Sequence, residues 1–134
     1  MHGSIGPNRK SLLSVTSVLE AATGLALLVM PSVVVELLLG AAPGTPSGVT
    51  VSRVVGAAML ALAVACWLAR EDAASRAAKG LVAAMLLYNV AVVAVLVLAG
   101  LFGIAFWPVV LAHAGLAVWC IAGLSMPALE EKRS

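Results

Sequence analysis

The stretch GLALLVMPSVVVELLLGAAPGTPSGVTVSRVVGAAML, residues 24–60, decides the fold of this chain. It joins the end of one long apolar run to the start of the next. Pro31 disfavours helix at the residue before it and suits the first turn of a new helix. The segment 31–39 is too short to cross a membrane, and it carries Glu36. We therefore predict a short helix at the membrane interface, ended by Gly40.

Apolar runs of membrane-spanning length extend on both sides of this stretch. A helix of about 20 residues covers about 30 Å, the thickness of the hydrocarbon core of a bilayer. No segment alternates apolar and polar residues as the strands of a membrane barrel do. The sequence predicts an all-α, integral membrane four-helix bundle that forms a single domain over residues 1–134. Its spans are expected at about residues 11–30, 50–69, 80–99 and 105–124.

The composition supports a membrane location and excludes several other classes. Of the 134 residues, 63% are apolar, and only 8 are basic and 6 acidic. A soluble domain has roughly 45–50% apolar and about 25% charged residues. Four spans use about 80 residues, which leaves no room for a separate soluble domain. The net charge of +2 is too small to suggest a nucleic-acid partner.

The distribution of basic residues predicts the orientation. Cytoplasmic loops of membrane proteins carry an excess of Lys and Arg, and only Arg53 lies near the other side. We therefore expect a multi-pass membrane protein with both termini in the cytoplasm. A cleaved signal peptide is the competing interpretation of the first run, but that run exceeds the usual 7–15 apolar residues. The residues on the basic side are Arg9, Lys10, Arg70, Arg76, Lys79, Lys132 and Arg133.

Five ionisable or amide side chains fall inside the predicted spans, where such groups are costly and normally face the bundle interior. Four of them share a level near the centre of the bilayer, and Arg53 starts nearer the outside, from where it can reach inward or snorkel outward. We expect the four to form one layer with Arg53 above it, and all five to line a candidate ligand site. They are Glu20, Arg53, Tyr88, Asn89 and His113.

Small residues accompany this layer. Ser17, Ala21 and Gly24 flank Glu20 at helical spacing, and Gly56 follows Arg53 on the next turn. Small side chains let two membrane helices approach closely. We therefore expect this face of the first span to pack against another helix.

Two interpretations of the polar layer stay open at this point. In the first, the layer is structural, and its hydrogen bonds fix the register of the helices. In the second, it is a site for a small ligand or for handling a proton, with Glu20 as the strongest single candidate.

The sequence lacks the motifs of the common catalytic chemistries. It has no C-x-x-C pair, no Lys within a span and only one intramembrane His, so a thiol relay, a Schiff base and a bis-His haem are not expected. It also lacks a glycine-rich phosphate loop, a Ser/His/Asp set and a metal-spaced cluster. An independent enzyme is therefore not favoured. The cofactor is unknown, with a quinone or a lipid as the possibilities.

The order of features in residues 20–70 resembles that of small bacterial four-helix membrane proteins of unknown function, related in layout to the DoxX-like proteins. The resemblance implies an inner-membrane four-helix bundle. Some DoxX-like proteins are linked to quinone-dependent sulfur oxidation, often within complexes, but no catalytic motif in this chain corresponds to that chemistry. The shared features are Pro31, Leu39-Gly40, the loop at 43–48, and Arg53 followed by Gly56.

Three functions fit these observations. The leading hypothesis is a non-catalytic accessory or self-associating component of a membrane complex, which packs against other membrane helices in the lipid bilayer. The alternative is a protein that binds a hydrophobic small molecule, a quinone or a lipid, in an intramembrane polar pocket. A small transporter or proton pathway is the third hypothesis.

Overall fold

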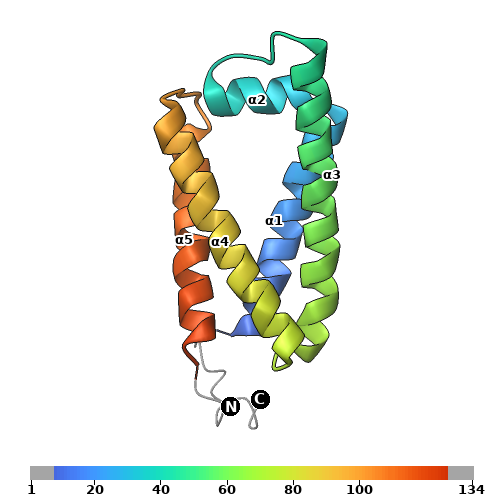
Figure 1. Cartoon of the computed structure of the whole chain (residues 1–134), viewed down its shortest axis with the longest axis vertical. Coiled ribbons are helices and arrows are strands. Elements are labelled where there is room, and N and C mark those ends of the chain that lie inside the picture. The colour runs from blue at the N-terminus through green and yellow to red at the C-terminus, as the bar shows by residue number, and fades with distance from the viewer. Residues whose placement is uncertain (1–7, 127–134) are drawn as a thin grey trace.

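The computed structural model describes residues 8–126, and all regular structure in that range is helical. Four helices, α1, α3, α4 and α5, are long and apolar enough to cross a membrane, and α2 is short (Figure 1). The prediction of an all-α chain with four long helices and one short connecting helix is confirmed. Two of the basic residues that predict the orientation, Lys132 and Arg133, lie outside the described residues. The elements are α1 (Arg9–Val29), α2 (Pro31–Leu39), α3 (Pro46–Ala69), a single 3-10 turn (Arg70–Asp72), α4 (Arg76–Ala99) and α5 (Phe106–Leu124).

Polar caps set where two of the long helices begin. The predicted starts at residues 50 and 80 mark the onset of apolar sequence, whereas α3 and α4 begin earlier, at Pro46 and Arg76. The hydroxyl of Thr45 accepts a hydrogen bond from the backbone N–H of Gly48 at 3.1 Å. The hydroxyl of Ser75 accepts from that of Ala78, also at 3.1 Å. Such caps satisfy N–H groups that a helix leaves without partners.

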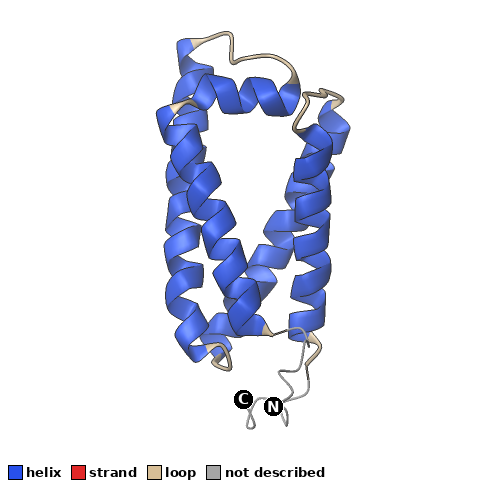
Figure 2. Ribbon diagram, turned by 180° about the vertical axis from the view of Figure 1, so that it is seen from behind, coloured by secondary structure: helices blue, strands red, loops and turns tan. Residues whose placement is uncertain are grey.

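The four long helices form two pairs. Helix α1 packs along α3, and α4 packs along α5. The pairs meet near the end of the molecule where α1 begins and α5 ends, and they diverge toward α2 (Figures 1 and 2). We call the end where the pairs meet the basic end, because the described basic residues other than Arg53 gather there. Its apolar core draws side chains from all four helices: Leu12, Leu13, Cys66, Ala78, Val82, Met85, Leu116 and Cys120.

Small residues bring the backbones of α1 and α3 into contact. A Cβ atom added to Gly24 would lie 2.7 Å from the carbonyl oxygen of Gly56, and the reverse contact has the same distance. About two turns before Gly24 in α1, the Ser17 hydroxyl donates a buried hydrogen bond of 2.8 Å to the carbonyl of Ala63. The prediction that this face of α1 lets another helix approach closely is confirmed.

Helix α2 lies across the far end and connects the two pairs (Figure 1). Its last turn packs on α4 and α5 through Leu38 and Leu39. The backbone N–H of Gly103 donates to the carbonyl of Leu38 at 3.0 Å, and that of Ala105 donates to the carbonyl of Leu37 at 2.8 Å. These bonds satisfy carbonyl groups that the end of α2 would otherwise leave without partners. The loop before α5 therefore holds α2 in place.

We expect the close approach of α1 and α3 to tolerate no added methyl group. Gly24→Ala or Gly56→Ala places a Cβ atom against backbone and should cost about 1–3 kcal/mol of stability. Gly115→Ala is the matched control, since a Cβ there meets nothing within 4 Å. Because alanine is the better helix former, the control should be neutral or should gain up to about 1 kcal/mol. Unfolding in mixed micelles measures both, and equal stability of all three variants would contradict the packing described.

Candidate functional site

Four of the five predicted site residues lie together between the two helix pairs. Glu20 comes from α1, Tyr88 and Asn89 come from α4, and His113 comes from α5. At 1.5 Å per residue, Glu20 lies about 17 Å from the start of α1, and Tyr88 about 18 Å from the start of α4. His113 lies about 17 Å from the end of α5. We call these four residues the polar cluster.

Asn89 and His113 form the tightly bonded half of the cluster. Asn89 is fully buried, and its Nδ2 donates a hydrogen bond of 2.7 Å to the carbonyl oxygen of Met85, one turn earlier in α4. The Oδ1 atom of Asn89 lies 2.7 Å from Nδ1 of His113. Both distances are short for hydrogen bonds. This half of the cluster therefore joins α4 to α5 firmly.

Tyr88 connects this half to Glu20. Its ring meets the ring of His113 edge to face, with centroids 5.7 Å apart. Its hydroxyl donates to Oε2 of Glu20 over 3.5 Å, which is long for a hydrogen bond between two oxygens. Tyr88 thus spans the boundary between the pairs, touching α5 with its ring and α1 with its hydroxyl.

Glu20 is the least satisfied member of the cluster. Its side chain is only 2% exposed. The long bond from Tyr88 is its one hydrogen bond within residues 8–126, and it forms no ion pair there. A carboxylate has about four acceptor positions, and a buried polar group without partners costs free energy. Glu20 therefore has unused acceptor capacity at the centre of the helices.

The structure does not bring Arg53 to the cluster. Arg53 is exposed and lies about 24 Å from the end of α3. The buried face of α3 is formed by Gly56, Met59, Ala63 and Cys66, and Arg53 falls to the side of that face. The four residues expected to share a layer lie together, whereas Arg53, expected above that layer, is exposed.

The sequence analysis also missed a structural role of Arg9, which it assigned only to topology. Arg9 is 5% exposed, and its Nε donates a hydrogen bond of 2.8 Å to the carbonyl oxygen of Gly123 in the last turn of α5. A cation at a helix C-terminus also interacts favourably with the helix dipole. No pattern in the sequence pairs residues this far apart, so only the fold reveals this contact.

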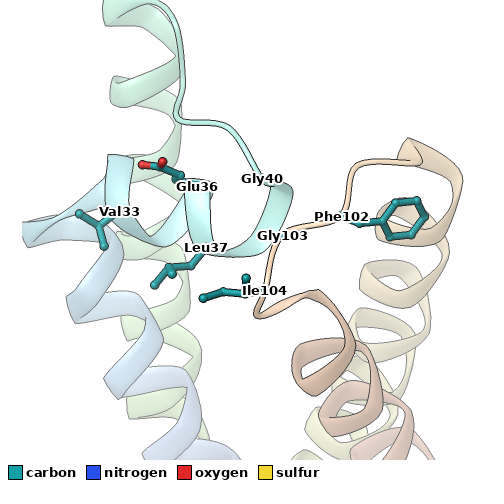
Figure 3. A pocket seen from close by; sticks show the side chains of 7 residues that line it. All are labelled: Val33, Glu36, Leu37, Gly40, Phe102, Gly103 and Ile104. Atoms are coloured by element: carbon teal, nitrogen blue, oxygen red, sulfur yellow. The ribbon is translucent and has the colours of Figure 1, made fainter.

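A hollow lies between α2 and the loop before α5, away from the polar cluster (Figure 3). It has a volume of about 330 Å³. Its lining is mostly apolar, and Figure 3 shows its one charged side chain, Glu36, pointing away from Leu37 and Ile104. No set of chemically complementary groups meets there. In the described part of the chain, no group of three His, Cys, Asp or Glu residues could hold a metal ion.

Comparison with protein families, with curated proteins and with solved structures finds no match for this chain. The layout resemblance to DoxX-like proteins therefore stays a hypothesis.

Two substitutions separate a structural role of the cluster from a binding role. Asn89→Leu removes both short hydrogen bonds and leaves Nδ1 of His113 without its partner, so we expect a loss of about 1–3 kcal/mol. Glu20→Gln keeps the size of the side chain and removes only one long bond, so its effect should stay within about 0.5 kcal/mol. Unfolding in mixed micelles measures both. If Glu20→Gln costs as much as Asn89→Leu, the carboxyl serves to hold the helices together.

Proposed function

We propose that this protein binds a hydrophobic small molecule, of the quinone or lipid type, whose polar head group lies at the polar cluster. The observation that carries the proposal is the buried Glu20 carboxyl, which receives a single hydrogen bond of 3.5 Å. An ionisable group at this depth is expensive to bury and commonly marks a substrate or ion site. A head group that bonds to Glu20 would offset this cost.

The position of the cluster also favours such a ligand. The core residues of α1 and α4 at the basic end, Leu12 and Met85 among them, precede Glu20 and Tyr88 in their helices. The cluster therefore lies at the edge of that core, and Tyr88 packs against it. An apolar tail could lie along the helices beyond the cluster, since most of their side chains there are apolar. Apolar walls with a few convergent polar groups are typical of small-molecule sites.

Native mass spectrometry of the gently purified protein tests this proposal. We expect one bound amphiphile per chain. Glu20→Met, an apolar replacement of similar length, should lower its occupancy at least tenfold while circular dichroism shows unchanged helix content. Glu36→Met is the matched control, because Glu36 is an exposed carboxylate on α2, and it should keep the ligand. A wild-type protein that retains no amphiphile, or a Glu20→Met variant with full occupancy, would overturn the proposal.

Association with other membrane helices is the second candidate function, and Arg53 favours it. This arginine is exposed on a helix long and apolar enough to cross a membrane, and within residues 8–126 it forms no ion pair. A cation in that position needs an anionic partner, either a lipid phosphate at the interface or a carboxylate of another helix. The chain would then act as a self-associating or accessory component of a membrane complex.

The mass of the protein in mild detergent tests the association. We expect a multiple of the 13.5 kDa chain mass for the wild type, or a defined complex from native membranes. Arg53→Met should convert the assembly to the single chain. Lys10→Met removes an exposed basic side chain at the opposite end and should leave the assembly intact. A wild-type protein that is monomeric and recovers no partner from its membrane would exclude this function.

We also propose that the basic end faces the cytoplasm of a bacterial cell and that α2 lies at the outer surface of the inner membrane. Five of the six described basic residues support this orientation through the excess of Lys and Arg on the cytoplasmic side. They are Arg9, Lys10, Arg70, Arg76 and Lys79.

A further inference from the structure

We infer that the polar cluster selects an amphiphile whose head group donates a hydrogen bond, such as an alcohol, a phenol or a hydroquinone, over one that offers only carbonyl or ether oxygens. This inference rests on the proposed binding function and specifies the chemical class of its ligand. The reason is that Nε2 of the half-buried His113 is an acceptor without a partner.

The side-chain amide of Asn89 has one defined orientation. Its Nδ2 faces the carbonyl oxygen of Met85 at 2.7 Å, and a carbonyl oxygen can only accept. The amide of Asn89 is therefore fixed in one orientation, with Oδ1 toward His113. Since Oδ1 can also only accept, the proton in the bond of 2.7 Å to His113 belongs to Nδ1 of the imidazole.

The other ring nitrogen of His113, Nε2, carries a lone pair. A neutral imidazole has one N–H, so a proton on Nδ1 leaves a lone pair on Nε2. The structure gives Nε2 no hydrogen-bond partner among the residues it describes, and no carboxylate there forms an ion pair with this ring. Nothing in the described surroundings of His113 favours the imidazolium, which would turn Nε2 into a donor. Nε2 is therefore an acceptor without a partner.

Tyr88 and Glu20 are hydrogen-bonded to each other. The single proton of the Tyr88 hydroxyl points toward Oε2 of Glu20. The Oε1 atom of Glu20 has no hydrogen bond within residues 8–126, and a carboxyl group keeps acceptor capacity in either protonation state. The second N–H of Asn89 is a donor without a partner in the described part of the chain, but it belongs to a side chain that is 0% exposed, whereas His113 is half-buried. A head group with a hydroxyl can donate to Nε2 of His113, whereas a carbonyl would meet that atom with a further lone pair.

Three probes of matched shape test this selectivity on the full-length protein in detergent micelles. They are 2-decylhydroquinone, its dimethyl ether and 2-decyl-1,4-benzoquinone, measured by equilibrium dialysis without oxygen. We expect the hydroquinone to bind at least tenfold more tightly than the other two. Asn89→Leu removes the partner that fixes the histidine tautomer and should reduce this preference to about threefold or less.

The outcomes distinguish the inference from the function it rests on. Equal binding of the three probes, or tighter binding of the quinone, overturns the donor selectivity and leaves the binding function standing. No binding of any probe, together with no amphiphile retained from the native membrane, overturns both. The protein purified from its native membrane can carry a different amphiphile. If the head group of that amphiphile has no O–H or N–H, the donor selectivity is overturned; if it has one, the selectivity is supported.

Nitrogen NMR tests the tautomer independently of any ligand. The chain has two histidines, so His2→Gln leaves His113 as the only labelled imidazole. We expect a protonated Nδ1 and an unprotonated Nε2 in the free protein. The hydroquinone should then shift the Nε2 signal toward its hydrogen-bonded position. A protonated Nε2 in the free protein would overturn the inference.

Discussion

The contact between the backbones of α1 and α3 at Gly24 and Gly56 is the constraint from which the rest of the arrangement follows. Lipid offers no hydrophobic drive for two apolar helices to associate, so close packing and hydrogen bonds have to hold them. Ser17 and Gly24 occupy nearly the same direction around α1, and both face α3. At about 100° per residue, Glu20 is turned roughly 40–60° away from that direction. The contact with α3 therefore turns Glu20 toward α4 and keeps it from the lipid.

The second helix pair meets the first over a limited length, and this determines where polar groups can be satisfied. The core at the basic end is closed by apolar side chains and by Arg9, which reaches the last turn of α5. At the other end, α2 connects the pairs through backbone hydrogen bonds with the loop before α5. The polar cluster lies between these two closures. Its groups gather at one level of the helices, an arrangement that suits a head-group site better than a chain of proton carriers.

The sequence was a good guide to features that depend on one helix at a time. Hydropathy, Pro31 and Gly40 predict the helices, because each acts within a few residues of itself in the chain. Depth along the spans predicts that Glu20, Tyr88 and His113 share a level. The direction of a side chain depends on which face of its helix is buried, and this is why depth alone left open whether Arg53 reaches the layer or is exposed. The pairing of Arg9 with Gly123 and the bond between Asn89 and His113 depend on tertiary packing that no local pattern encodes.

The two charged residues within the spans, Glu20 and Arg53, are not partners of each other, and this separation bears most directly on function. A cluster that served only to join helices would gain most by pairing its carboxylate with the available cation, since an unpaired charge in a membrane is costly. Instead, Arg53 is exposed beside the buried face of α3, while Glu20 is buried with one long hydrogen bond. Asn89 and His113 join α4 to α5 through a short hydrogen bond, so the register of these two helices does not depend on the carboxyl. In the two proposed functions, both residues find their polar partner outside the chain. Glu20 bonds to the head group of a ligand, and Arg53 pairs with an anionic group of a lipid or of a neighbouring helix.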